Sequence, residues 1–304
     1  MKIRANNIDI EVTDSAPGDS SRPVVLLIMG LGMQLIAWPP AMVQGLVDAG
    51  FRVVRFDNRD AGLSQHFDEL GMPNLVWQGM KYKLGLRITP PYSLTEMAMD
   101  SVGVLDGLEI AQAHIVGLSM GGMIAQRVAL LAPARVLSLT SVMSSSGARG
   151  LPAASAEVTK ALFSRPVNKG KQAAIDHSVK LFKVIGSHGS TPGFEMLDAD
   201  LRQRVTEATE RSFHPQGIAR QMVSIVADGA RAKALSGITA STLVVHGKAD
   251  PLVPFACGED TARRIPGATL VGVEEMGHDL PPGVVARLLE LMIPHFEKAG
   301  AGTL

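Results

Sequence analysis

One serine stands between two glycines in the stretch Gly117-Leu118-Ser119-Met120-Gly121. An apolar run ends just before it, and a pattern typical of a helix begins directly after it. G-x-S-x-G in this setting is typical of a tight strand-to-helix turn that strains the serine backbone and exposes the hydroxyl. The pattern predicts that Ser119 is a nucleophile. A serine that only caps the helix would not require both glycines.

A serine hydroxyl needs a base, and the base must be held by a third group. In "HGKADPLVP", Asp250 follows a predicted buried strand, and in "EEMGHDLP", His278 lies in the loop after the last predicted strand. We expect His278 to take the proton of Ser119 and Asp250 to orient His278. Three other carboxylates lie nearer to the histidine in the sequence: Glu274, Glu275 and Asp279. Loop geometry nevertheless favours Asp250, which ends the neighbouring strand.

Attack on a carbonyl also needs N–H donors for the oxyanion. The loop "MGLG" after the third predicted strand places the N–H of Leu31 near that of Met120, and we predict that these two are the donors. Glycines in this loop let the backbone approach a substrate closely. The candidate residues of the substrate pocket are Gly30, Gly32, Met33 and Trp38.

Alternating strand and helix patterns predict an α/β fold. Candidate strands cover residues 3–5, 8–12, 24–29, 53–56, 114–116, 137–142, 242–246 and 269–273. Candidate helices cover residues 41–49, 94–108, 120–131, 259–265 and 282–296. Continuous apolar strands followed by helices favour a mostly parallel sheet covered on both faces. Strand patterns stop between 143 and 232, so we predict a helical cap there, inserted between core parts 1–142 and 233–304.

Composition sets further limits on function. The 304 residues carry equal numbers of basic and acidic side chains, so no excess charge points to nucleic acid or to an anionic membrane. The single cysteine excludes an internal disulfide and makes the cytoplasm the default compartment. Residues 24–47 contain no charge, but glycines and prolines interrupt them, so we interpret them as a strand, a loop and a short helix. After the next strand, Asp57 and Arg59 are expected to form an ion pair.

The motifs "MGLG", "FDNRDAGLS", "GLSMGG", "HGKADPLVP" and "MGHDLP" together resemble those of the α/β-hydrolases, over nearly the whole chain. Within that superfamily the chain is most similar to the aclacinomycin methylesterase-like hydrolases. The resemblance implies an eight-stranded, mostly parallel sheet with an inserted helical cap. Many relatives carry His-Gly where this chain has Met29-Gly30, a difference that leaves the backbone donor in place.

These features predict a serine esterase for small to medium, fairly apolar esters, working through an acyl-enzyme without metal or organic cofactor. The partner is then a small-molecule ester, and a homodimer stays open. The same catalytic groups also fit lactone opening, carbon–carbon bond hydrolysis and perhydrolysis. A non-catalytic small-molecule receptor is a further alternative. So is a peptidase for N-terminal residues, which would bind the amine through Glu195 and Asp198.

Overall fold

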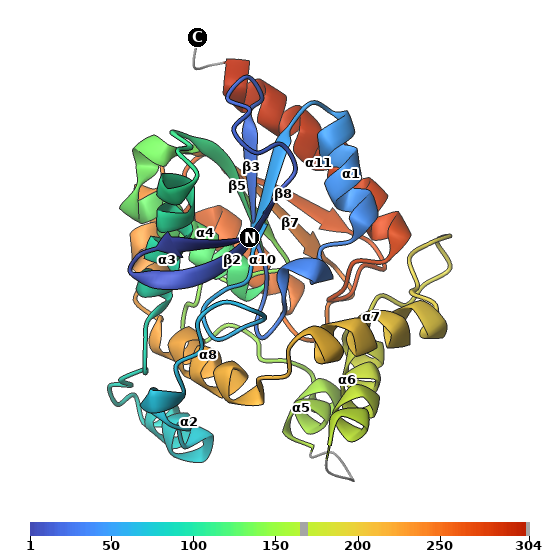
Figure 1. Ribbon diagram of the computed structural model, residues 1–304. Helices are drawn as coiled ribbons and strands as arrows, with labels where there is room; N and C mark the ends of the chain where they lie inside the picture. The colour runs from blue at the N-terminus through green and yellow to red at the C-terminus, as the bar shows by residue number, and fades with distance from the viewer. Residues whose placement is uncertain (165–169, 302–304) are drawn as a thin grey trace.

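The computed structural model describes residues 1–164 and 170–301, and Figure 1 shows their arrangement. One eight-stranded sheet has the order β1-β2-β4-β3-β5-β6-β7-β8. β1 pairs with β2, and β2 with β4, in antiparallel fashion, and the strands from β4 to β8 are parallel. The strands are β1 Lys2–Ala5, β2 Ile8–Asp14, β3 Val24–Ile28, β4 Arg52–Phe56, β5 Ala113–Leu118, β6 Val136–Val142, β7 Ser241–Gly247 and β8 Thr269–Val273.

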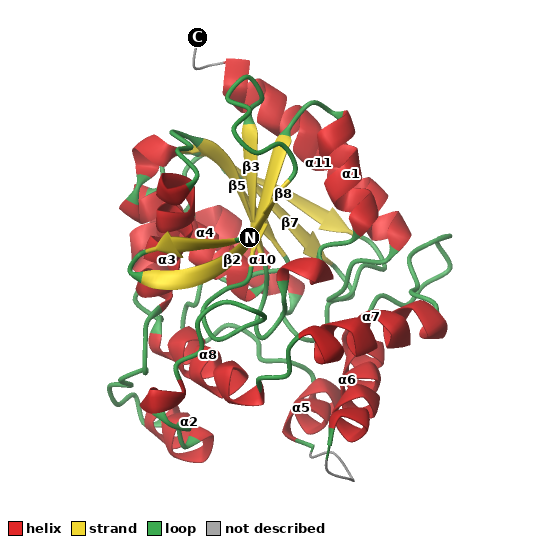
Figure 2. Ribbon diagram, viewed as in Figure 1, coloured by secondary structure: helices red, strands yellow, loops and turns green. Residues whose placement is uncertain are grey.

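Helices cover both faces of this sheet, as Figure 2 shows. Successive side chains of a strand point to opposite faces, so a strand buried on both sides contributes to two cores. In β3, Leu26 and Ile28 belong to the core under α3 and α4, whereas Val25 and Leu27 belong to the core under α1 and α11. These helices are α1 Pro40–Asp48, α3 Leu94–Gly107, α4 Met120–Leu131 and α11 Pro282–Ala301.

The remaining helices connect or cover the ends of the sheet. α10 packs on β7 and β8, and α5 to α8 gather below the sheet in Figure 1. Their bounds are α2 Leu75–Lys83, α5 Ala156–Phe163, α6 Lys171–Ile185, α7 Asp198–Arg211, α8 Pro215–Ala227, α9 Arg231–Ala234 and α10 Phe255–Arg264.

The predicted elements agree well with this architecture. All eight predicted strands are present, and predicted helix 120–131 coincides with α4. The other four predicted helices are present as α1, α3, α10 and α11, with shifted ends. α2 was not predicted, because its apolar residues do not form a buried face. α5 to α8 fall within residues 143–232, and the division of the chain into core and cap stays a prediction.

The charge-free segment 24–47 forms β3, the short helix Leu35–Ala37 and most of α1. Pro39 and Pro40 start α1, where the missing proline N–H would be unpaired in any case. Among the described residues, no helix is long and apolar enough to cross a membrane.

Candidate active site

Ser119 occupies the turn between β5 and α4. Its φ of 56° and ψ of −119° lie in a strained region for a residue with a side chain. The two flanking glycines are required by space: a Cβ on Gly117 would lie 2.1 Å from the Gly121 oxygen, and one on Gly121 would lie 2.0 Å from the Ile28 oxygen. Neighbouring β6 holds the turn, because Ser119 N–H donates to the Val142 oxygen at 2.9 Å.

A hydrogen-bonded chain joins the three side chains expected from the sequence. His278 Nε2 lies 3.0 Å from Ser119 Oγ, and His278 Nδ1 lies 2.7 Å from Asp250 Oδ2. Because an ionised carboxylate only accepts, the proton belongs on Nδ1, which leaves Nε2 free to accept from the serine. The second oxygen of Asp250 accepts the N–H groups of Leu252 and Val253, at 2.9 and 2.8 Å. The aspartate therefore holds the imidazole from a fixed position.

The three carboxylates nearer to His278 in the sequence have other partners. Glu274 pairs with Lys248 at the surface. Hydrogen bonds from Thr191 and Ser190 lower the pKa of Glu275 to about 2. Asp279 accepts from the N–H and hydroxyl of Ser187, and burial raises the pKa of this carboxyl.

The loop that carries His278 is fastened to the end of α6, a contact that no sequence motif indicated. His278 N–H donates to the Ile185 oxygen at 2.7 Å, and Gly277 N–H donates to Ser187 Oγ at 2.9 Å. The two chains touch at glycines, since a Cβ on Gly277 would lie 2.3 Å from the Gly186 oxygen. The position of the histidine thus depends on α6 as well as on β8.

The glycine loop after β3 lies beside the serine. A Cβ on Gly30 would be 3.3 Å from both the Leu118 oxygen and Ser119 Cβ. Gly32 has a φ of +66°. Within the described part of the chain, the N–H groups of Leu31 and Met120 have no hydrogen-bond acceptor. This arrangement places two unpaired donors at the turn and at the loop next to it.

Two amide side chains support this loop. Asn58 Nδ2 donates to the Met29 oxygen at 2.9 Å. Gln221, which is buried on α8, accepts the Gly32 N–H at 2.8 Å and donates to the Arg59 oxygen at 2.8 Å. The support therefore comes from the loop after β4 and from α8, and sequence reasoning missed both residues.

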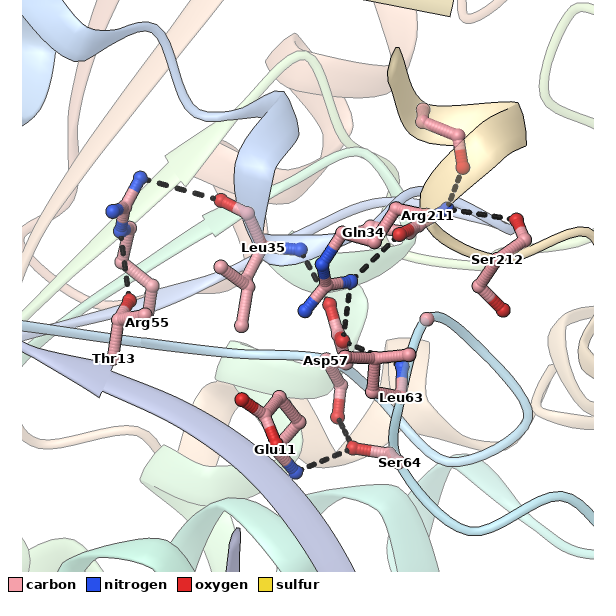
Figure 3. Close-up of polar contacts among 12 residues, drawn as sticks. Glu11, Thr13, Gln34, Leu35, Arg55, Asp57, Leu63, Ser64, Arg211 and Ser212 are labelled. Atoms are coloured by element: carbon pink, nitrogen blue, oxygen red, sulfur yellow. Dashed lines mark hydrogen bonds and ion pairs between the residues drawn. The ribbon is translucent and has the colours of Figure 1, made fainter. Parts of the chain in front are cut away.

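The predicted ion pair between Asp57 and Arg59 is wrong. Arg59 instead pairs with Asp100 on α3, at 2.6 and 2.7 Å. Asp57 pairs with Arg211 at the end of α7, with Nη1 at 2.8 Å from Oδ2, as Figure 3 shows. The chain turns after Asp57, so the carboxylate faces the glycine loop while Arg59 faces α3.

Asp57 also accepts two backbone N–H groups, from Leu35 at 2.6 Å and from Leu63 at 2.8 Å. Burial nevertheless raises the pKa of this carboxyl. Arg211 also donates a hydrogen bond to Oε1 of Gln34, and the amide nitrogen of Gln34 donates to the Ser212 oxygen (Figure 3). The end of the glycine loop is therefore tied to both the sheet and α7.

The two candidate pocket walls differ in their surroundings. Met33 is half-buried and packs at the margin of the core under α1 and α11. Trp38 has no exposed surface and packs inside that core, with its indole N–H unpaired among the described residues. Its burial gives no support to the prediction that Trp38 lines the substrate pocket.

Comparison with known proteins agrees with the motifs and the fold. Rhodomycin D methylesterase DnrP of Streptomyces peucetius is 28% identical over 96% of this chain and 97% of that protein. DauP, the rhodomycin D methylesterase of Streptomyces sp. strain C5, is also 28% identical, over 93% of each chain. The meta-cleavage product hydrolase CumD from Pseudomonas fluorescens IP01 has a similar structure, with a TM-score of 0.74 and 21% identity over 98% of both chains. The family model for the α/β hydrolase fold matches residues 23–281. This chain therefore belongs to the α/β-hydrolase fold family.

Proposed function

We propose that the protein is a serine carboxylic ester hydrolase for small to medium, fairly apolar esters. The observation that carries the proposal is the hydrogen-bonded chain from Ser119 through His278 to Asp250. The similarity over nearly full length to two rhodomycin D methylesterases supports an ester, and a methyl ester in particular, as the substrate.

The proposed reaction has two steps. Ser119 Oγ attacks the carbonyl carbon while His278 Nε2 takes its proton, and Asp250 stabilises the imidazolium. The N–H groups of Leu31 and Met120 bind the oxyanion, and the alcohol leaves with the proton from His278. Water, deprotonated by the same histidine, then attacks the acyl-enzyme, and the acid is released from Ser119.

The backbone supports this assignment of the donors. Met120 begins α4, whose N-terminus favours developing negative charge. Leu31 lies between two glycines, one of them directly beside Ser119. Gln221 takes up the N–H of Gly32, which leaves that of Leu31 for the oxyanion.

The central test is Ser119→Ala with a panel of p-nitrophenyl and methyl esters of graded acyl length. We expect the variant to keep its fold and to lose about three to six orders of magnitude in turnover. A fluorophosphonate should label the parent protein and not the variant. Labelling of the variant at another serine would contradict the assignment of the nucleophile.

The same panel, extended by lactones and vinylogous diketones, separates the alternative reactions. Faster turnover of lactones or vinylogous diketones than of every ester would favour lactone opening or carbon–carbon bond hydrolysis on the same three side chains. Tight binding of an ester without appreciable hydrolysis would favour a receptor.

A further inference from the structure

Helix α2 and its flanks expose large apolar side chains. α2 packs against α8, and Leu75 and Gln78 on its inner side are half-buried. On its outer side, Val76 is 76% exposed, Trp77 48% and Met80 47%. With residues of the two flanks they form what we call the α2 patch: Met72, Val76, Trp77, Met80, Leu84 and Leu86.

This distribution is the reverse of an ordinary surface helix, which turns apolar residues inward and polar residues outward. Val76, Met80 and Leu84 follow one another at intervals of four, so they lie on one side of the helix. Exposed apolar side chains gathered in this way mark a surface that contacts something else.

Cations accompany the α2 patch, and acids are absent from its sequence. Residues 71–95 contain Lys81, Lys83 and Arg87 but no aspartate or glutamate. Lys81 Nζ lies 5.7 Å from the ring centre of Trp77, so the cation sits among the apolar side chains. Long basic side chains can lie along apolar surface while their charged ends reach polar groups.

A groove of about 770 Å³ adjoins the α2 patch, and Tyr82 and Leu86 belong to its lining. The lining contains four cationic side chains, Arg87, Arg149, Lys233 and Arg264, and Arg264 pairs with Asp260. Its one carboxylate, Asp228, already pairs with Arg127 and Arg231. The surface beside the apolar side chains is therefore suited to anionic groups.

We propose that the α2 patch docks the protein on an anionic lipid surface. Apolar side chains of α2 enter the headgroup region, and the cations contact lipid phosphates. α2 stands at the periphery of the molecule in Figure 1, at the lower left beside α8, so a flat surface can reach it. The proposal is independent of the proposed ester hydrolysis.

The positive charge around the α2 patch favours an anionic lipid surface over a second copy of this chain as its partner. A two-fold contact through the α2 patch would bring the same surface of both copies together. Lys81, Lys83 and Arg87 of one copy would then face those of the other. The expectation of no membrane partner rested on the net charge of zero, which hides this local excess.

The experiment measures binding to vesicles of phosphatidylcholine with and without phosphatidylglycerol. The chain has two tryptophans, and because Trp38 is fully buried, a change in emission reports on Trp77. We expect co-sedimentation and a blue shift with the anionic vesicles only. Both should disappear at about 0.5 M salt, where surface charges are screened.

Two variants and a matched control locate the interaction. Each lysine near an anionic surface strengthens partitioning about fivefold, so Lys81→Gln with Lys83→Gln should weaken it about 25-fold. The control, Arg287→Gln with Lys298→Gln, removes the same charge from exposed positions on α11, at the other side of Figure 1. It should bind as the parent does.

Val76→Ser with Met80→Ser should also weaken binding, and exposure of both side chains lets the fold persist. Three results would overturn the proposal. One is no binding to anionic vesicles by the parent protein. Another is equal weakening in the α11 control. The third is self-association without lipid that Val76→Ser with Met80→Ser abolishes, which would assign the α2 patch to a second copy.

Discussion

Replacing Arg211 by methionine tests how α7 is held to the loop after β4. Asp57 has no exposed side-chain surface, and Arg211 is 18% exposed. Removing one partner of a buried ion pair costs about 3–5 kcal/mol, because a charge is left without compensation. Asp57 keeps the N–H groups of Leu35 and Leu63, so we expect the lower end, about 3 kcal/mol of unfolding free energy at pH 8.

The loss should depend on pH with a defined sign. Burial raises the pKa of Asp57 in the folded protein, and Arg211 opposes that shift, so the variant raises this pKa further. A carboxyl with a folded pKa above its unfolded value destabilises the fold as pH rises through the folded pKa. The deficit of Arg211→Met should therefore grow as pH rises above about 4, the pKa of an aspartate in the unfolded chain, and be full above the raised folded pKa.

Urea unfolding of parent and variant at several pH values between about 5 and 8 measures this difference. Lys183→Met is the control, because Lys183 pairs with Asp198 on the surface, where the side chains are 46% and 75% exposed. It should cost less than about 1 kcal/mol at every pH. If the deficit of Arg211→Met is independent of pH, or no larger than that of the control, Asp57 is not a charge that Arg211 compensates.

Two further comparisons test the proposed catalytic machinery. Asp250→Asn should lower turnover about ten-thousand-fold, because the amide favours the wrong histidine tautomer. Glu275→Gln should change turnover less than about tenfold. The reverse ranking of the two variants at equal stability would exclude Asp250 as the group that orients His278. Gln221→Leu leaves the Gly32 N–H unpaired, at a cost of about 1–3 kcal/mol, and should lower kcat about 10- to 100-fold with little change in KM. Gln203→Leu, at an exposed position of α7, is its control, and a rise in KM with kcat unchanged would argue that Gln221 does not position the loop.

Local sequence patterns were sufficient to predict much of the fold. Strand and helix periods are properties of adjacent residues, so all eight strands and the helices that cover the sheet were predictable. The strained turn at Ser119 was predictable because the five-residue motif is itself local, and the space that requires Gly117 is taken up by Gly121. The space that requires Gly121 is taken up by Ile28 of β3, a contact that only the tertiary structure shows. Asp250 and His278 follow the ends of parallel strands, which meet at one edge of the sheet whatever the details of packing.

The partners of buried polar groups were decided only by the tertiary structure. Asp57 and Arg211 are 154 positions apart, and Gly32 and Gln221 are 189 apart. Packing brings such residues within hydrogen-bonding distance, and proximity in the sequence does not rank the possible partners of a buried charge. The prediction of Arg59 as the partner of Asp57 was therefore wrong. The exposure of apolar side chains on α2 was likewise decided by tertiary packing. The sequence of a short helix does not tell which of its apolar residues will be buried. The position of α2 against α8 decides this, and it leaves Val76, Trp77 and Met80 on the surface.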